Sequence, residues 1–207
     1  MDYSEINLKQ VSSETNLTTI YRYKQFYANL KYRSSSLVIL DVGCNTGRGG
    51  EVLKKLNTKY TLFGIDCVAE RLQKAERVYD RVMNCNTVAI PQANNSIDVI
   101  LAGEFIEHLT YKDALLTLSE FYRILRKNGQ ILLTTPNPGY IKLKLTRASV
   151  LGGAHLSQFY PSDLMTIMRE RGFSGIILKG SGRVAKYFGE FWPFTWIYGS
   201  YLIYAQK

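Results

Sequence analysis

A glycine-rich turn directly after an apolar run is the segment best suited to hold a ligand. The letters DVGCNTG, residues 41–47, follow the apolar run 37–40, and a helical pattern begins near Gly49. Such a turn lets backbone amides approach a ligand and points a helix N-terminus at negative charge. A dinucleotide-binding turn has glycine where Asn45 stands, to make room for a pyrophosphate. Asp41 would repel a pyrophosphate and attract an ammonium, so the turn favours a ligand with an amino-acid end over a nicotinamide dinucleotide.

A second carboxylate stands at the end of the next apolar run. Asp66 follows Gly43 by 23 residues and ends the segment Gly64-Ile65-Asp66. A carboxylate at this place can accept hydrogen bonds from both hydroxyls of a ribose. The alternative is that Asp66 caps the following helix. Together, the turn and Asp66 predict a ligand in which a nucleoside is joined to an amino acid.

The elements that position these residues alternate along the chain between apolar runs and helical patterns. Strands are predicted over 37–40, 60–65, 81–83, 97–102, 130–135, 174–179 and 196–205, and helices over 18–32, 49–56, 69–79, 112–125 and 162–170. Asn128-Gly129 is expected to end the helix 112–125 as a C-cap. The alternation predicts a mainly parallel sheet with helices on both faces, and the last two strands predict an antiparallel hairpin at one edge. Ligands bind outside the carboxyl ends of the strands in such sheets.

Four blocks of the sequence together resemble a known family. They are LDVGCNTG (40–47), FGIDCVAERLQKA (63–75), SIDVILAGEFIEHL (96–109) and FYRILRKNGQILLTTPNP (121–138). The set resembles class I S-adenosylmethionine-dependent methyltransferases, and its last two blocks are most similar to the small-molecule enzymes of ubiquinone biosynthesis and to sugar methyltransferases. The resemblance implies a Rossmann-like seven-stranded sheet, S-adenosylmethionine as cofactor and S-adenosylhomocysteine as product. It also implies one domain with a helical cap (1–35), a cofactor-binding half (36–136) and an acceptor-side half (137–207).

The resemblance assigns cofactor contacts to individual positions of this sequence. The methionine portion would be lined by Asp41, Gly43, Cys44, Asn45 and Gly47. Asp66 would hold the ribose, with Cys67 beside it under the adenine. Asn86, followed by Thr87, stands where relatives usually have an aspartate that bonds the adenine amino group, and an amide oxygen accepts that bond without the charge. The sulfonium would be faced by Ala102, Gly103 and Glu104, with Phe105 packed nearby.

For methyl transfer from a sulfonium, the protein mainly has to hold the acceptor atom in line with the S–CH3 bond and exclude water. A general base adds about 10²–10⁴-fold where one is used. The chain has two histidines, His108 and His155, and each is a candidate base that Glu107 could orient; the alternative is that both are structural. No Cys-x-x-Cys or His-x-x-x-His pair occurs, so no metal is expected. The three cysteines each follow a predicted strand and should meet around the adenosine half of the site.

Charge bears on the kind of acceptor. The net charge is +9, but lysines and arginines are scattered and form no block of five or six, which favours solvated helix faces over a nucleic-acid surface. Lys142, Lys144 and Arg147 lie in the long connection 137–159 and indicate an anionic acceptor such as a phosphorylated or nucleotide-linked sugar, or simply a solvated helix face. The aromatic-rich C-terminus indicates core and edge strands, with a hydrophobic acceptor groove or a membrane-surface contact as the alternative.

We therefore expect methyl transfer to a hydroxyl or amine of a small molecule, with no membrane span and a cytoplasmic location, because no signal-peptide pattern opens the chain. Two alternatives stay open. A nucleic-acid methyltransferase would usually carry an Asn/Asp-Pro-Pro-Tyr motif after the fourth strand, where this chain has Ala102-Gly103-Glu104-Phe105. A non-catalytic cofactor-binding protein of the same fold would share every motif above. The sequence does not predict the oligomeric state.

Overall fold

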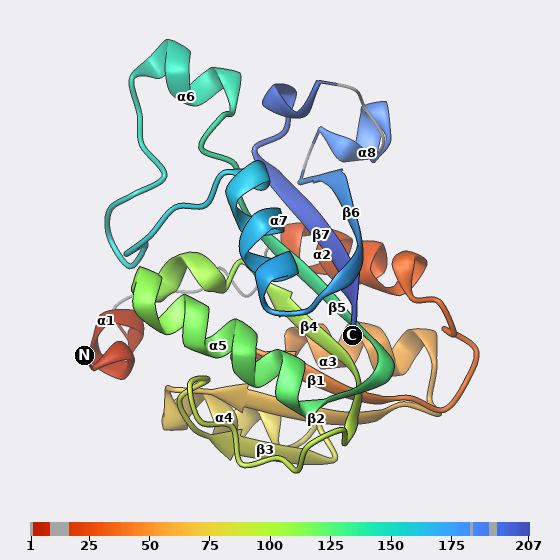
Figure 1. Cartoon of the computed structure of the whole chain (residues 1–207). Coiled ribbons are helices and arrows are strands. Elements are labelled where there is room, and N and C mark those ends of the chain that lie inside the picture. Colours follow the sequence, from red (N-terminus) through yellow and green to blue (C-terminus); the bar gives the residue numbers. More distant parts are fainter. Residues whose placement is uncertain (1, 9–16, 183, 191–193) are drawn as a thin grey trace.

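A mixed β-sheet forms the centre of the molecule (Figure 1). The structure is a computed structural model and describes residues 2–8, 17–182, 184–190 and 194–207. Within these residues the sheet has seven strands in the order β3-β2-β1-β4-β5-β7-β6. The strands are β1 (Val38–Val42), β2 (Thr61–Asp66), β3 (Arg81–Asn84), β4 (Ile97–Gly103), β5 (Leu125–Pro136), β6 (Ser174–Ser181) and β7 (Ser200–Gln206). The first five pair in parallel, and β7 pairs antiparallel with both β5 and β6. This confirms the predicted fold class.

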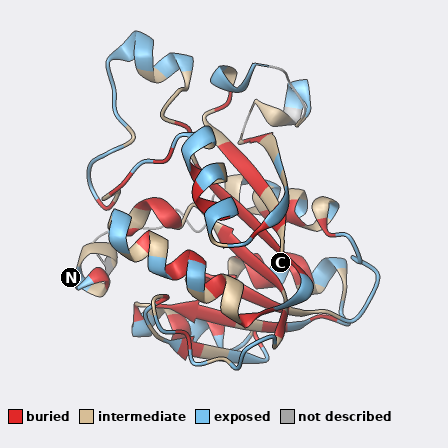
Figure 2. Ribbon diagram, in the orientation of Figure 1, coloured by how far each residue is buried: buried red, intermediate tan, exposed pale blue. Residues whose placement is uncertain are grey.

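Helices cover both faces of the sheet (Figure 1). They are α1 (Tyr3–Leu8), α2 (Leu17–Asn29), α3 (Arg48–Leu56), α4 (Ala69–Ala75), α5 (Tyr111–Ile124), α6 (Ile141–Thr146), α7 (Pro161–Glu170) and α8 (Ala185–Phe188), with the 3-10 turns η1 (Ile106–His108) and η2 (Thr195–Ile197). The buried side chains of α2, α3 and α4 share one hydrophobic cluster, and those of α5 and α7 share the other. The sheet between the two layers is the most continuously buried part of the chain (Figure 2).

The parallel strands appear as unbroken apolar runs because each strand is buried on both faces. Successive side chains point to opposite faces, so Ile39 packs with α2 and α3 while Leu40 packs in the other cluster. Asp41 therefore points to the same face as Ile39, and it is fully buried there. This alternation decides where the first carboxylate of the glycine-rich turn lies.

One sequence prediction was wrong at the C-terminal side of the fold. Asn128 and Gly129 do not cap a helix: α5 ends at Ile124, and both residues lie inside β5. Asn128, in the left-handed region at φ 64°, donates from its backbone nitrogen to Lys207 O over 3.1 Å, and Lys207 N donates to Gly129 O over 3.0 Å. The sheet therefore uses these two residues as an irregular strand start.

The predicted antiparallel pair of closing strands is present at the edge, but its connection is longer than expected. Strand β6 forms the edge, and β7 inserts between β5 and β6. The connection between them contains α8 and η2, so Trp196 belongs to a 3-10 turn and the last strand begins only at Ser200. The short helices α1, α6 and α8 were not predicted, because four to six residues carry too little periodicity to be recognised.

Candidate active site

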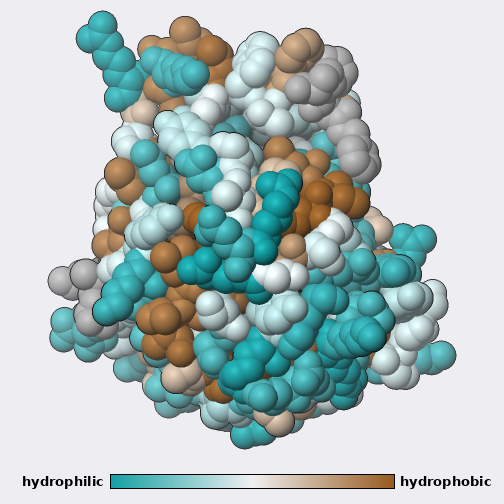
Figure 3. Space-filling view, in the orientation of Figure 1, coloured by the Kyte–Doolittle hydropathy of each residue, from teal (hydrophilic) through white to brown (hydrophobic). Residues whose placement is uncertain are grey.

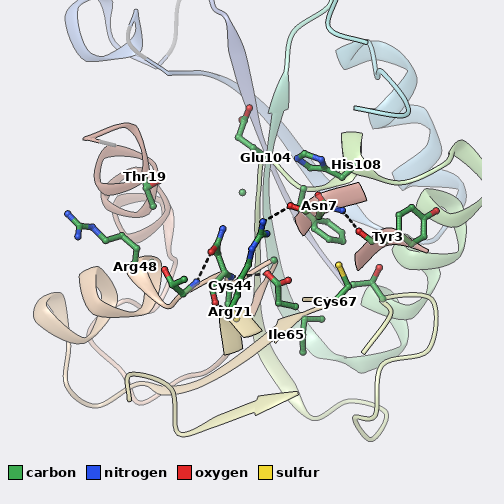
Figure 4. Close-up of a pocket in the computed structure, with 18 of the residues that line it drawn as sticks. Tyr3, Asn7, Thr19, Cys44, Arg48, Ile65, Cys67, Arg71, Glu104 and His108 are labelled. Carbon is green, nitrogen blue, oxygen red and sulfur yellow. Dashed lines mark hydrogen bonds between the residues drawn. The ribbon is translucent and has the colours of Figure 1, made fainter. Parts of the chain in front are cut away.

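A cavity of about 340 Å³ lies at the carboxyl ends of β1, β2 and β4 (Figure 4). Its wall includes eleven of the predicted site residues: Gly43, Cys44, Asn45, Asp66, Cys67, Asn86, Thr87, Gly103, Glu104, Phe105 and His108. Residues of α1 and α2 complete the wall on the side away from the sheet. The fold therefore brings most of the predicted residues to one place, while their individual roles stay predictions.

The glycine-rich turn is tied to the neighbouring strand. The backbone nitrogens of Gly43 and Cys44 both donate to Ile65 O, at 2.9 and 3.0 Å. Gly43 adopts φ +68°, and a Cβ there would come within 3.2 Å of the Phe105 ring. Asn45 adopts φ +51°, a left-handed conformation that asparagine tolerates better than most residues, and its side-chain oxygen accepts from Thr46 N at 2.8 Å. The Asn45 side chain thus stabilises the turn in a conformation that glycine more often adopts.

Asp66 joins the turn to the end of β2. Its Oδ2 accepts from Asn45 N at 3.0 Å and its Oδ1 from Val68 N at 2.9 Å. The residue before α4 is Val68, with no side-chain cap, so Asp66 is not the N-cap of that helix. Each carboxylate oxygen can accept a second hydrogen bond, which leaves capacity for two hydroxyl groups. Burial raises the pKa of Asp66, and the two backbone donors oppose that shift.

Asp41 lies behind the cavity wall, contrary to expectation. Its Oδ1 accepts from the Tyr23 hydroxyl at 2.6 Å, and its Oδ2 accepts a short hydrogen bond from the Tyr79 hydroxyl. Tyr23 lines the cavity, whereas Asp41 does not. Burial raises the pKa of Asp41 to about 6, while the two hydroxyls lower it. Asp41 therefore fixes the wall through Tyr23, and its contact with a ligand stays a prediction.

Two further predicted residues lie outside the cavity wall. Gly47 adopts φ +99° and packs against α4, where a Cβ would come within 3.2 Å of Ala75 Cα. Ala102 is fully buried in the core, because its side chain points to the α5 face of the sheet. Both residues belong to the elements that carry the wall, and their roles as cofactor contacts stay predictions.

Three thiols gather along the cavity, as their positions after β1, β2 and β3 predicted. Cys44, Cys67 and Cys85 all line it. Burial raises the pKa of Cys67 and of Cys85 to about 11, and it raises the pKa of Cys44 further. The thiols are therefore protonated and weakly nucleophilic at neutral pH. Thr87, beside them, shares a 2.8 Å hydrogen bond with Thr117 Oγ1.

The far side of the cavity carries an acidic residue in an unusual conformation (Figure 4). Glu104 has φ +53°, and its backbone nitrogen donates to Thr134 O at 2.9 Å. Its Oε2 accepts from Ser200 Oγ at 3.3 Å, and Oε1 lies 3.9 Å from Arg22 Nη2. Within the part of the chain that the structure describes, buried Oε1 has no hydrogen-bond partner. This oxygen is available to an incoming polar group.

Glu107, His108 and His155 form what we call the two-histidine cluster. His108 Nδ1 lies 3.1 Å from Ala154 O, His155 Nδ1 lies 2.9 Å from Val150 O, and the ring centroids are 4.9 Å apart. Because a carbonyl can only accept, each Nδ1 carries a proton, and the His108 ring in its neutral form keeps a lone pair on Nε2. Burial and the neighbouring His155 lower the pKa of His108 to about 4. Of the three side chains, only His108 lines the cavity.

Glu107 is the buried member of the two-histidine cluster. Its Oε2 accepts from Thr135 Oγ1 at 2.9 Å, and burial with the nearby Glu104 raises its pKa well above the usual range. Each of the three side chains offers one potential metal-ligand atom, and these atoms all lie within 4.8 Å of one another. Sequence spacing alone could not exclude this grouping, since the histidines are 47 residues apart. The absence of a metal stays a prediction.

The cavity-lining residues of the N-terminal helices were not predicted individually. They are Tyr3 and Asn7 of α1, and Thr18, Thr19, Arg22 and Tyr23 of α2. Outside these helices, Thr46, Arg48, Gly49, Ile65, Arg71 and Leu109 also line the cavity. For the residues of α1 and α2, the sequence predicted only a helical cap over 1–35. The individual residues could not be predicted, because the sequence of an amphipathic helix does not show what its polar side chains contact.

The comparisons with known proteins agree with this geometry. Residues 40–133 match a family model described as a methyltransferase domain. A probable S-adenosylmethionine-dependent methyltransferase of Mycolicibacterium smegmatis is 27% identical over 154 residues, which cover 73% of this chain and 58% of that protein. One from Mycobacterium tuberculosis is 24% identical and is covered over 57% of its length. The chain thus spans less than three-fifths of the length of these curated relatives.

Solved structures share the fold. A SAM-dependent methyltransferase from Archaeoglobus fulgidus superposes with a TM-score of 0.68 at 18% identity, covering 89% of this chain and 94% of that one. A phosphoethanolamine N-methyltransferase from Haemonchus contortus, solved with S-adenosyl-L-methionine, gives 0.67 at 15% identity over 100% of this chain and 60% of that one. The fold is therefore the Rossmann-like methyltransferase fold. Residues 40–133 are thus similar in sequence to a methyltransferase domain, and the described chain shares its fold with solved S-adenosylmethionine-dependent methyltransferases.

Proposed function

We propose that this chain transfers a methyl group from S-adenosylmethionine to a hydroxyl or amine of a small-molecule acceptor. The observation that carries the proposal is the single cavity wall that joins the glycine-rich turn, Asp66 and Glu104. When bound, the cofactor supplies a methyl group already activated for displacement. The chain then has to bind the cofactor, orient the acceptor and exclude water. The acceptor has to approach from the Glu104 side.

The residues present fit this cofactor. Asp66 keeps free accepting capacity for the ribose hydroxyls beside its two backbone donors. At Gly43 any side chain would press on the Phe105 ring, so the backbone of the turn stays open to a methionine group. We assign the adenine to the wall formed by Cys67, Asn86 and Thr87. The cofactor half is then 36–136, capped by residues within 1–35.

His108 is the best-placed base for an acceptor that must lose a proton. It lines the cavity, its low pKa keeps the ring neutral at pH 7, and Nε2 keeps the lone pair. His155 and Glu107 do not line the cavity, so we give them positioning roles. His155 contacts the His108 ring edge-on. The Glu107 side chain accepts from Thr135 Oγ1, and its backbone carbonyl oxygen accepts from Leu156 N and Ser157 N. The acceptor side is 137–207, the half that contains His155.

The cations predicted to meet an anionic acceptor are not in the cavity wall. Lys142, Lys144 and Arg147 lie on or beside α6 and are exposed. The cations that do line the cavity are Arg22, Arg48 and Arg71. Support for an anionic acceptor therefore comes from these arginines and not from α6. A small-molecule acceptor, the absence of a nucleic-acid partner and a cytoplasmic location stay predictions of the sequence.

The test begins with the cofactor. S-adenosylhomocysteine is titrated by calorimetry into the wild type and Asp66→Ala, with NAD as the control ligand. We expect micromolar binding of S-adenosylhomocysteine that is lost in Asp66→Ala, and no binding of NAD. Tighter binding of NAD would refute the proposal. Labelled S-adenosylmethionine is then offered with panels of hydroxyl and amine acceptors and with RNA: transfer to RNA would replace the small-molecule acceptor, and binding without any transfer would favour a non-catalytic role.

A further inference from the structure

Two segments project from the same edge of the sheet (Figure 1). The first follows β5 and carries α6; the second joins β6 to β7 and carries α8 and η2. Both emerge where β5 ends and β7 begins, since Pro136 pairs with Ser200. This is the edge at which β1, β2 and β4 end and the cavity lies, so whatever covers these segments also faces the acceptor side.

Hydrogen bonds join the two segments into one unit, which we call the platform (α6, α8 and η2). Asn137 is 2% exposed; its backbone nitrogen donates to Gly199 O at 2.9 Å, and its side-chain nitrogen donates to Thr195 O and Tyr198 O at 2.9 and 3.1 Å. Helix α6 also packs against η2. Because the N–H groups of this buried asparagine donate to carbonyl oxygens of the other segment, they fix the relative position of the two segments.

The platform exposes large apolar side chains. Leu145 is 77% exposed, Phe188 59%, Phe194 50% and Trp196 47%. Figure 3 shows apolar and strongly polar side chains side by side over α6, whereas those over α8 are mostly of intermediate hydropathy. Single exposed apolar residues are ordinary, but such a gathering on projecting segments marks an interaction surface.

The charge beside these side chains is of one sign. Residues 137–162 contain no aspartate or glutamate, and they contain Lys142, Lys144 and Arg147, all exposed. Between 184 and 207 the one acidic residue is Glu190, which pairs with Lys179 at 3.2 Å. Cations next to exposed Leu, Phe and Trp match a bilayer surface: the cations meet anionic headgroups, and the apolar and aromatic groups enter the interfacial layer.

We propose that the platform docks this protein on the surface of an anionic lipid bilayer. No helix among residues 2–8, 17–182, 184–190 and 194–207 is long and apolar enough to cross a membrane, so the contact lies in the plane of the interface. Docking would turn the cavity edge toward the lipid and favour an acceptor that resides there. Docking itself does not depend on the proposed function; only this consequence for the acceptor does.

The test measures binding to vesicles without cofactor or acceptor. Wild type is sedimented with phosphatidylcholine vesicles containing 30% phosphatidylglycerol and with phosphatidylcholine alone. We expect binding to the anionic vesicles that weakens with salt. Both tryptophans, Trp192 and Trp196, lie in the segment before β7, so brominated lipid should quench the tryptophan fluorescence. The proposal would be overturned if the protein did not bind the anionic vesicles. It would also be overturned if brominated lipid did not quench the tryptophan fluorescence of the bound protein.

Variants separate the platform from general charge. Lys142→Gln with Lys144→Gln should weaken vesicle binding about 30-fold, since each cation near the surface contributes roughly fivefold. Leu145→Ser, at a side chain 77% exposed, should weaken it without unfolding the protein. The matched control, Lys55→Gln with Lys59→Gln, removes two exposed cations near the amino end of β2 and should leave most binding intact. If the two double variants lost vesicle binding equally, docking through the platform would be refuted. S-adenosylhomocysteine binding by the same variants in solution tests the proposed function separately.

Discussion

Removing the Tyr79 hydroxyl should destabilise the protein more at pH 8 than at pH 5. The hydroxyl donates to Asp41 Oδ2 and accepts from Gly50 N at 3.0 Å, in a site where both side chains are buried. Burial beside Asp41 raises the pKa of Tyr79 well above its usual range, so the hydroxyl stays a donor at both pH values. Tyr79→Phe therefore removes one donor from Asp41 and one acceptor from Gly50.

The size of the effect follows from the charge of Asp41. At pH 8 the carboxylate is ionised, and losing a hydrogen bond to a charged group costs about 2–3 kcal/mol, with about 1 kcal/mol more for the orphaned Gly50 nitrogen. At pH 5, below the folded pKa of about 6, the carboxyl is protonated, and both bonds together are worth about 2 kcal/mol. At roughly 2–4 °C of melting temperature per kcal/mol, Tyr79→Phe should melt about 10 °C lower at pH 8 and about half as much at pH 5.

The sign agrees with proton linkage. The folded pKa of Asp41, about 6, exceeds its ordinary value of 3.8, so the folded state binds this proton more tightly, and the group's contribution to stability falls as pH rises from about 4 to 6. The Tyr79 hydroxyl lowers that pKa, so its removal extends the fall above pH 6. Thermal unfolding followed by circular dichroism at both pH values measures the difference.

A second buried tyrosine provides the control. The Tyr201 hydroxyl donates to Phe159 O at 2.8 Å, which is a neutral acceptor, so Tyr201→Phe should cost about 1 kcal/mol at either pH. If Tyr79→Phe also lost equal stability at pH 5 and pH 8, the carboxylate would not be the acceptor that matters, and the reasoning about Asp41 would be wrong.

Four further predictions concern the cavity. Asp66→Asn should weaken S-adenosylhomocysteine binding about 10–100-fold in calorimetry; unchanged affinity would remove Asp66 as the ribose anchor. His108→Gln should lower kcat for a hydroxyl acceptor about 10²–10⁴-fold, while the dissociation constant of S-adenosylhomocysteine stays the same. An unaltered kcat would exclude His108 as the base. With pKa values of about 11, Cys67 and Cys85 should react slowly with iodoacetamide at pH 7.5 and faster as pH rises, and bound S-adenosylhomocysteine should slow both. EDTA should leave methyl transfer unchanged, whereas loss restored by a divalent cation would place a metal at the two-histidine cluster.

The parts of this fold that could be predicted from sequence are those whose burial leaves a local pattern. Strands β1 and β4 are buried on both faces, so each appears as a run of apolar letters, and the turn after β1 carries its glycines in sequence. Asp66 was placed beside the turn because parallel strands end at one edge. These inferences need only a segment and its neighbour.

The remaining features depend on partners far away in the chain. The alternation along β1 sets the face on which Asp41 lies, but its partners there are Tyr23, 18 residues before it, and Tyr79, 38 residues after it. His108 and His155 meet only because the connection after β5 folds back across η1, where Leu156 N donates to Glu107 O at 2.9 Å. No spacing rule relates such residues.

The antiparallel strand explains why the platform lies at the edge of the sheet that carries the cavity. In a wholly parallel sheet only the connections that leave a strand emerge at the carboxyl edge. Because β7 runs antiparallel, it begins at that edge, and the segment leading into it must lie there too. The connection after β5 leaves from the same place, so Asn137 can bond across to Gly199. Inserting β7 between β5 and β6 therefore places a second segment next to α6, and the two together make a surface that neither could form alone.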